Sequence, residues 1–261
     1  MKFTFHAGAW GSDHLFQAIN AIAGAKFPAV EIYADVASAY EGKADEFLFF
    51  LDKAGLELAG AYGGGVFTDP DFREFDVLAA RNAARWLRAA GGRNLILQGG
   101  EGTGDPKRDL QVAASVANSV GQTCREEGID FSYQPHVGTV VFKEPEIRQF
   151  FQMTHRDNVG ICLDTGHFAE AGVDMIPFVV DMAQRIRVVH LRDLRRKPVF
   201  VGGPFANPGK GTVPLPAVMA ALRAQGYDGW VVGFADDPKE DPAMSAASFA
   251  QYASGKLNIP V

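Results

Sequence analysis

The chain repeats one junction four times, in which a mixed polar and apolar segment runs into glycine and then into a short apolar segment. The four junctions read DKAGLEL, LRAAGGRNLIL, CREEGIDFSY and LRAQGYDGWVV. A glycine in the left-handed conformation commonly closes a helix, so each junction predicts a helix followed by a strand. The clearest helix has apolar residues three or four apart, at Leu110, Ala113, Ala117, Val120 and Cys124. The pattern therefore predicts a chain that alternates between helix and strand.

Eight short apolar segments predict eight strands. They cover residues 3–5, 30–32, 56–61, 94–97, 131–133, 159–163, 188–191 and 230–232. Helical segments separate nearly every pair, and strands that are joined by helical crossovers are parallel. Eight such units in 261 residues favour a closed (β/α)8 barrel, the TIM barrel, with an open doubly wound sheet as the alternative. No shift in composition and no long linker divides the chain, so we expect residues 1–261 to form a single barrel domain.

Composition and charge narrow the class of protein. Hydrophobic residues make up 47% of the chain and no segment is apolar for long enough to span a membrane, which is typical of a soluble globular protein. The net charge of −6 argues against a nucleic-acid partner, because such binding depends on basic surface. The first residues do not resemble a signal peptide, so a cytoplasmic location is expected. Cys124 and Cys162 lie in a predicted helix and a predicted strand, which indicates buried, reduced thiols.

Active sites of TIM barrels lie at the C-terminal ends of the strands, so the polar residues found there are the candidates. They are His6, Glu31, Tyr62, Gln98, Gln134, His136, Asp164, His167, His190, Asp193 and Asp236. Each has a structural explanation when taken singly; Asp164, for example, is a good N-cap for the segment that follows it. Together, Gln134, Asp164 and His190 place an amide oxygen, a carboxylate and an imidazole at three successive strand ends. This combination predicts a site for a divalent cation.

Residues 197–212, KPVFVGGPFANPGKGT, have no regular pattern and follow the seventh predicted strand, so they are predicted to form an active-site loop. A basic cluster precedes and enters this loop, formed by Arg192, Arg195, Arg196 and Lys197. Asp193 interrupts the cluster, which is therefore predicted to be a solvated surface segment, with a site for a substrate phosphate as the alternative. The glycine-rich segments GGEGTGD and NPGKGT lack the spacing of a phosphate-binding loop, so no nucleotide site is expected.

With strand ends that read YQPHVGT, LDTGH, VVHLRD and YDGWVV, the sequence resembles the xylose isomerase-like TIM barrel superfamily. Its members include sugar isomerases and epimerases, inosose dehydratases, dehydroshikimate dehydratases and endonuclease IV repair enzymes. The PHVGT segment is most similar to the inosose dehydratase branch, whereas LDTGH is shared widely. An endonuclease is disfavoured by the acidic charge and by too few ligands for several metal ions.

The resemblance implies a divalent ion, with Mn²⁺ expected and Mg²⁺, Co²⁺ or Zn²⁺ as alternatives, held at the positions of Gln134, Asp164, His190 and Phe234. Two of these positions depart from the family pattern. Gln134 stands where many relatives carry glutamate, and Phe234 in VVGFADDP replaces the glutamate of VVELDDP. Only Asp164 then brings a negative charge, so the ion is expected to be weakly held. Asp236 shares a strand face with Phe234 and is a candidate replacement ligand.

The same departures bear on the chemistry, because epimerases of this superfamily use two metal-bound glutamates as acid and base. His136 and His167 remain, and an imidazole pKa near ~6.5 suits proton transfer. We expect an isomerase or epimerase that moves a proton next to the carbonyl of a sugar or cyclitol. A dehydratase or other lyase is the first alternative, and a non-catalytic sugar-binding subunit is the second. Substrate contacts are expected from His6, Glu31, Gln98, Asp193, Lys210 and Phe234. A homo-oligomer is expected, with a hetero-oligomer as the alternative.

Overall fold

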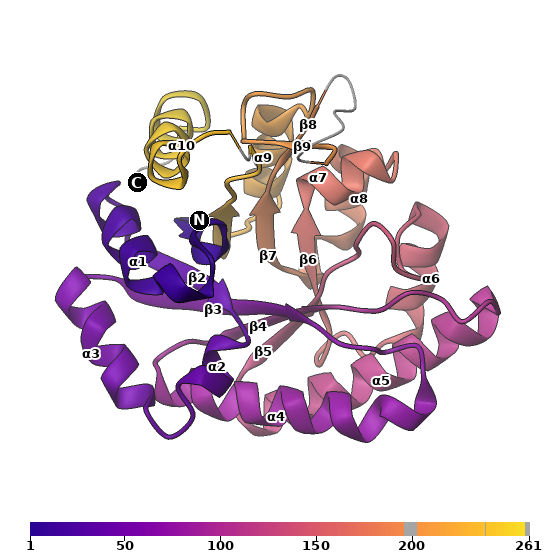
Figure 1. Cartoon of the computed structure of the whole chain (residues 1–261). Helices are drawn as coiled ribbons and strands as arrows, with labels where there is room; N and C mark the ends of the chain where they lie inside the picture. The colour runs from indigo at the N-terminus through magenta and orange to yellow at the C-terminus, as the bar shows by residue number, and fades with distance from the viewer. Residues whose placement is uncertain (196–202, 238, 259–261) are drawn as a thin grey trace.

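The computed structural model describes residues 1–195, 203–237 and 239–258. Eight strands close into a barrel in the order β1-β10-β7-β6-β5-β4-β3-β2 (Figure 1). They are β1 (Lys2–His6), β2 (Ala29–Tyr33), β3 (Glu57–Gly64), β4 (Asn94–Gln98), β5 (Asp130–Tyr133), β6 (Gly160–Asp164), β7 (Ile186–Leu191) and β10 (Trp230–Gly233). Every neighbouring pair is parallel. The closed barrel is confirmed, and each of the eight predicted strands is present.

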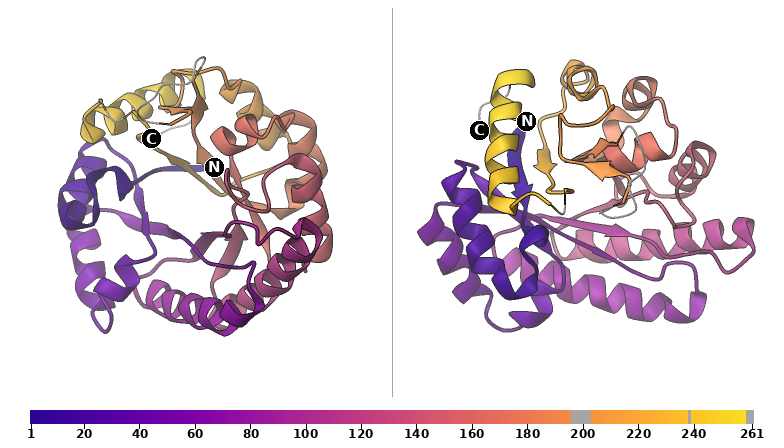
Figure 2. Two further views of the ribbon diagram at one scale, coloured as in Figure 1. Left: turned by 45° about the vertical axis from the view of Figure 1, so that its right-hand side comes forward. Right: turned by 45° about the horizontal axis from the view of Figure 1, so that its top comes forward.

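The helices form an outer ring around the strands (Figure 2). They are α1 (Leu15–Gly24), α2 (Val36–Ala39), α3 (Ala44–Ala54), α4 (Arg73–Ala89), α5 (Pro106–Glu126), α6 (Glu144–Met153), α7 (Thr165–Glu170), α8 (Met175–Met182), α9 (Leu215–Ala224) and α10 (Pro242–Lys256), with short 3-10 turns η1 (Ala7–Trp10), η2 (Ser12–His14), η3 (Pro70–Phe72) and η4 (Ala183–Arg185). The junction glycines behave as predicted: Gly55, Gly91, Gly128 and Gly226 follow α3, α4, α5 and α9, with positive φ between 71° and 82°.

The barrel interior is filled by a small apolar cluster that is separate from the larger core between strands and helices. Its buried members are Tyr62, Ile96, Cys162, Val188, Val232 and Phe234. Side chains two apart on a strand share a face, so Asp164 follows Cys162 and His190 follows Val188 toward the C-terminal mouth of the barrel. Closure of the sheet and this alternation bring the predicted polar residues together above the apolar cluster.

Two further predictions can be compared with the structure. Cys124 and Cys162 are free and buried, as expected. The predicted loop at 197–212 begins among residues outside the described ranges, and its later part contains a strand that the sequence pattern did not indicate. This strand, β9 (Phe205–Ala206), pairs antiparallel with β8 (Asp193–Leu194) beside the barrel mouth. Across the described ranges, no helix is long and apolar enough to cross a membrane.

Candidate active site

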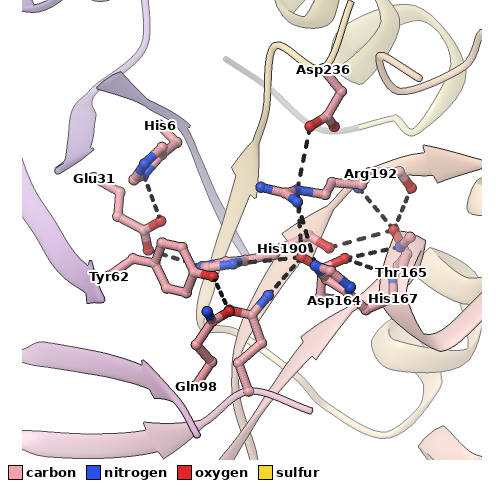
Figure 3. Close-up of polar contacts among 12 residues, drawn as sticks. His6, Glu31, Tyr62, Gln98, Asp164, Thr165, His167, His190, Arg192 and Asp236 are labelled. Atoms are coloured by element: carbon pink, nitrogen blue, oxygen red, sulfur yellow. Dashed lines mark hydrogen bonds and ion pairs between the residues drawn. The ribbon is translucent and has the colours of Figure 1, made fainter. Parts of the chain in front are cut away.

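A fully buried polar group at the barrel mouth consists of His6, Glu31 and His190, which we call the floor (Figure 3). Strand register places His6 beside Glu31, and the two side chains meet at 3.1 Å between Nδ1 and Oε1. His190 reaches across the barrel, with its Nε2 at 3.1 Å from Oε2 of Glu31. All three side chains are at most 2% exposed. A carboxylate only accepts hydrogen bonds, so both imidazoles must donate to Glu31.

These contacts explain how the buried carboxylate of Glu31 remains ionised. Burial opposes ionisation of Glu31, but the neighbouring His190 and His6 outweigh it and hold its pKa at about 2. Burial also lowers the pKa of His6, against the opposing effect of Glu31. Each floor imidazole keeps one ring nitrogen, Nε2 of His6 and Nδ1 of His190, without a hydrogen-bond partner among the described residues. Glu31 is therefore an anionic bridge that orients the two histidines of the floor.

Asp164 at the end of β6 is the most heavily bonded side chain of the mouth. Its Oδ1 accepts the backbone N–H groups of Gly166 and His167, at 3.0 and 3.1 Å, which is the predicted N-cap of α7. Its Oδ2 accepts from Nε2 of Gln134 at 2.8 Å and lies 3.8 Å from Nδ1 of His190. Burial opposes its ionisation, but the neighbouring cationic and imidazole side chains hold its pKa below the usual value. The N-cap and the predicted cluster are thus both present.

Arg192 lies inside this cluster, and its prediction as a solvated surface residue is wrong. Its side chain is 14% exposed, with Nε at 3.6 Å from Oδ2 of Asp164 and 3.7 Å from Oδ1 of Asp236 (Figure 3). The hydroxyl of Thr165 accepts from its backbone N–H and donates to its carbonyl, at 2.9 and 2.6 Å. A signal for this existed in the sequence: Arg192 stands two residues after His190, on the same strand face. Arg196 and Lys197 lie outside the described residues.

Phe234 follows β10 and lies between the floor and Arg192. Its ring stacks on His6, with centroids 4.6 Å apart and planes at 19°, and lies 4.8 Å from the ring of His190. The Arg192 guanidinium carbon lies 4.0 Å from the centre of the Phe234 ring, within the range of a cation–π interaction. The ring is 4% exposed. The structure therefore brings Phe234 to the predicted site but buries it beneath an arginine.

His136 and His167, the two histidines predicted to be catalytic, lie together with ring centroids 3.8 Å apart. The backbone N–H of Val137 donates to Nδ1 of His167 at 3.3 Å, and Nδ1 of His136 lies 2.7 Å from the carbonyl oxygen of Val137. Burial lowers the pKa of His167 to about 3 and also lowers the pKa of His136. His167 is buried, whereas His136 is partly exposed. Both imidazoles are consequently neutral near pH 7.

A cleft of about 490 Å³ opens beside this pair. His136, Gln98 and Glu101 are among its polar lining residues. Gln98 accepts a hydrogen bond from the Tyr62 hydroxyl at 2.8 Å, which fixes the orientation of its amide. A larger cavity of about 800 Å³ lies outside the barrel between α2 and α4, but its lining does not include the predicted catalytic groups. The cleft beside His136 is therefore the better place for a substrate.

The partly exposed polar side chains above the floor are Gln98, His136, Arg192 and Asp236, which we call the rim. Two of them contact His167: its ring lies 3.8 Å from that of His136, and its Nε2 lies 3.5 Å from Nη1 of Arg192. Asp236 was predicted only as a spare metal ligand. Its Oδ2 has no partner among the described residues, and burial raises its pKa to about 6.

Two residues predicted to bind substrate do not join the cluster. Asp193 is buried, and its oxygens accept the backbone N–H groups of Leu194, Gly209, Gly211 and Val213. Lys210 is largely exposed and pairs with Glu240 at 2.8 Å. The contacts of Asp193 fasten the loop that follows β7, and those of Lys210 belong to the protein surface. Their predicted substrate contacts gain no support from these positions.

The predicted metal ligands converge, but as they lie they do not fit a divalent ion. Gln134 turns its NH₂ group toward Asp164, and Phe234 offers no ligand atom. Oε1 of Gln134 and Nδ1 of His190 have no hydrogen-bond partner among the described residues and are the atoms of these side chains that could coordinate an ion. No group of three or more His, Cys, Asp or Glu side chains within the described ranges is arranged to hold a metal. Arg192 already contacts Asp164, and at an effective dielectric near 20 its repulsion of a further unit positive charge near ~4 Å, about 4 kcal/mol, offsets the attraction of the Asp164 carboxylate at that distance.

Comparisons with known proteins agree with this architecture. A family model described as xylose isomerase-like TIM barrel matches residues 19–251. Inosose dehydratase from Lacticaseibacillus casei is 27% identical over 240 residues, which is 81% of this chain and 80% of the relative. The solved structure of 3-keto-D-glucoside 4-epimerase, YcjR, from E. coli has a TM-score of 0.79 at 19% identity, over 95% of this chain and 97% of that one.

A second solved structure, the IOLI protein with a bound zinc atom, has a TM-score of 0.80 at 15% identity and covers 98% of both chains. At such identities the structural likeness shows the fold. The dehydratase relatives confirm the prediction of an enzyme of this class, an isomerase or epimerase or a dehydratase. With most of its length matched by the family model, the chain belongs to the xylose isomerase-like TIM barrel family.

Proposed function

We propose that this protein is a dehydratase that removes a proton next to the ketone of a cyclitol or sugar and then releases water from the adjacent carbon. An inosose, the ketone of an inositol, is the substrate class that the sequence relatives suggest. One observation carries the proposal: a single neutral imidazole, that of His136, faces the cleft at the barrel mouth. This is the arrangement that a one-sided elimination needs.

The tautomer of His136 follows from its contact with Val137. A carbonyl oxygen only accepts, so Nδ1 of His136, 2.7 Å away, must carry the ring proton. Nε2 then holds the lone pair. Because burial keeps the pKa of this ring below 6.5, the base is in its active form at neutral pH.

The proposed step uses that one base twice. Nε2 of His136 takes the proton from the carbon next to the ketone, and the electron pair of the broken C–H bond forms an enolate. The enolate then expels the hydroxyl group of the neighbouring carbon, and the imidazolium returns its proton to that group. Water leaves, the ketone becomes an unsaturated ketone, and His136 regains its neutral form. No oxidant or second base is needed.

His167 has a different role in this scheme, although the sequence suggested it as a second catalytic histidine. The Val137 N–H occupies its Nδ1 lone pair. Its other nitrogen faces the Arg192 guanidinium, and the low pKa keeps the ring neutral. These contacts support a positioning role for His167, which holds the Val137 backbone and thereby the orientation of His136.

An isomerase or epimerase, the activity first predicted, ranks second. Epimerisation requires acid and base groups on opposite faces of the substrate carbon. The two positions that the family resemblance assigns to such groups hold Gln134 and Phe234, and neither side chain exchanges protons near neutral pH. The proposed step therefore involves one face of the substrate, and no part of it passes through a metal ion.

A panel of inososes and keto-sugars tests the proposal. We expect the purified protein to convert an inosose into an unsaturated or dicarbonyl product that absorbs in the near ultraviolet and has lost the mass of one water molecule. His136→Gln should abolish the conversion, whereas His155→Gln, which changes an exposed imidazole, should not. If wild-type protein binds a panel member and changes none, the non-catalytic binding subunit is the correct interpretation.

A further inference from the structure

The positive charge of Arg192 lies beside Asp164 at the barrel mouth. Asp164 Oδ2 accepts from Gln134 and lies 3.6 Å from the Arg192 guanidinium, while Asp164 Oδ1 is filled by two backbone N–H groups. Asp164, the only carboxylate among the metal ligands that the family resemblance assigns, thus already has its partners within the chain. In these contacts, the neighbours of Asp164 are N–H groups that donate to it and the guanidinium of Arg192.

The two residues that depart from the family pattern, Gln134 and Phe234, both stabilise the surroundings of Arg192. Glutamine at 134 supplies the NH₂ group that bonds Asp164, which a glutamate in ionised form would not. Phenylalanine at 234 supplies the ring face on which the guanidinium lies, at 4.0 Å. The side chains that remove metal ligands are therefore the ones that support Arg192.

The guanidinium is held on several sides at once. Asp164 and Asp236 flank it with opposite charge, and Thr165 fixes its backbone through two hydrogen bonds. Its Nε is buried and lies between these two carboxylates at 3.6 and 3.7 Å, and 14% of the side chain remains exposed. A charged hydrogen-bond donor that is fixed in place and partly exposed at the barrel mouth is suited to a substrate oxygen that gains negative charge.

We propose that this protein works without a bound metal ion, and that the Arg192 guanidinium binds the ketone oxygen of the substrate and stabilises the negative charge which the enolate places on it. Its role in turnover rests on the proposed function, proton removal beside a ketone. The absence of a metal requirement does not rest on the proposed function, because it follows from the side chains that surround Asp164.

Metal content and binding test the first half without any substrate. Protein purified without chelator should contain less than about one-tenth of an equivalent of Mn, Zn, Co or Fe by elemental analysis, and calorimetric titration with Mn²⁺ or Zn²⁺ should give no binding at the barrel mouth. The triple variant Gln134→Glu, Phe234→Glu, Arg192→Ala should gain Mn²⁺ binding. Stoichiometric metal in the wild-type protein that Asp164→Ala removes would overturn the proposal.

Kinetics test the second half. Arg192→Gln should lower kcat by about 10²- to 10³-fold, the usual cost of losing one donor to a developing oxyanion, with a smaller change in KM. Arg192→Lys should keep part of the rate, because the charge stays while the planar fork is lost. Arg148→Gln, an arginine on α6 that also pairs with two carboxylates, should leave kcat unchanged.

Chelator and added metal complete the test. Dialysis against EDTA and addition of Mn²⁺, Mg²⁺ or Zn²⁺ should leave the wild-type rate within about twofold. An activity that EDTA abolishes and Mn²⁺ restores, or an Arg192→Gln variant with wild-type kcat, would contradict the proposal. If no ketone in the panel reacts, the proposed function fails, while metal content and calorimetry still decide whether the site binds an ion.

Discussion

The floor of the barrel mouth, formed by His6, Glu31 and His190, differs from the rim above it in how its charges are neutralised. In the floor, one carboxylate accepts two hydrogen bonds at 3.1 Å and every side chain is at most 2% exposed. In the rim, Arg192 and Asp236 face each other at 3.7 Å and Asp236 keeps an oxygen without a described partner. Close hydrogen-bonded pairing makes the floor rigid. The looser pairing in the rim leaves polar groups available to a ligand.

This difference assigns separate roles to histidines that look alike in the sequence. His6 and His190 are fixed by Glu31 and lie under Phe234, so they shape and stabilise the mouth. His136 is partly exposed and lines the cleft. The comparison therefore places stability mainly in the floor and catalysis mainly in the rim, and variants of each should affect mainly one of these properties.

The largest expected effect is on catalysis, from His136→Gln in the rim. Removal of the base should lower kcat by about 10²- to 10⁴-fold, the range typical of general acid–base catalysis. The free energy of unfolding should change by less than about 1 kcal/mol, because the ring is partly exposed and makes one hydrogen bond. Steady-state kinetics and urea denaturation of the same preparation measure both. A large loss of stability at unchanged kcat would reverse the roles of floor and rim.

The next effect is on stability, from Glu31→Gln in the floor. The amide has one acceptor oxygen for two donating histidines and no charge, so we expect the free energy of unfolding to fall by about 3–5 kcal/mol, as when one partner of a buried ion pair is removed. The matched control is Glu57→Gln, whose exposed contact with Lys2 at 3.9 Å should be worth less than about 1 kcal/mol. Equal losses in the two variants would show that the floor does not depend on the charge of Glu31.

A smaller effect is expected from Asp193→Ala, which distinguishes a loop anchor from a substrate contact. Loss of the acceptor for four backbone N–H groups should lower the free energy of unfolding by about 2–3 kcal/mol. KM should change little in protein that remains folded. Lys210→Ala provides the comparison, because its ion pair with Glu240 lies at the surface. A KM that rises at least tenfold with unchanged stability would restore the predicted substrate contact of Asp193.

The smallest effect concerns pH. The pKa of His167 is about 3 in the folded protein and near 6.5 when unfolded, so the unfolded state binds more protons as the pH falls below 6.5. Stability should therefore be complete above pH 6.5 and should fall toward pH 5 by at most about 1.4 kcal/mol per pH unit from this group. Urea denaturation between pH 7 and pH 5 should show a shallower slope for His167→Gln. An identical slope in both proteins would mean that this histidine is not buried in neutral form.

Much of the fold could be predicted because it depends on local and periodic signals. Glycine junctions with positive φ and short apolar segments mark where each helix ends and each strand lies. Strand alternation then indicated which side chains meet at the mouth, and Gln134, Asp164 and His190 do meet there. Such features are set by the backbone and by which face of a strand is buried.

The parts that were missed depend on which partner each polar side chain finds. The charged residues next to Arg192 in the sequence predict a surface position. In the structure, two carboxylates and an aromatic ring surround it. Asp193 reads as a substrate ligand from its position after β7, yet four backbone amides take its oxygens. These partners come from residues 18 or more positions away in most cases, and a periodic pattern carries no information about them.

Exchange of the proton next to the ketone tests the central claim, that the rim removes this proton with His136 as the base. An inosose is incubated in D₂O with wild-type protein, His136→Gln and Glu31→Gln, and loss of the proton signal at the carbon beside the ketone is followed by NMR. We predict rapid exchange or elimination with the wild-type protein, none above background with His136→Gln, and retained exchange in the folded fraction of Glu31→Gln. Exchange by His136→Gln at the wild-type rate would contradict the account.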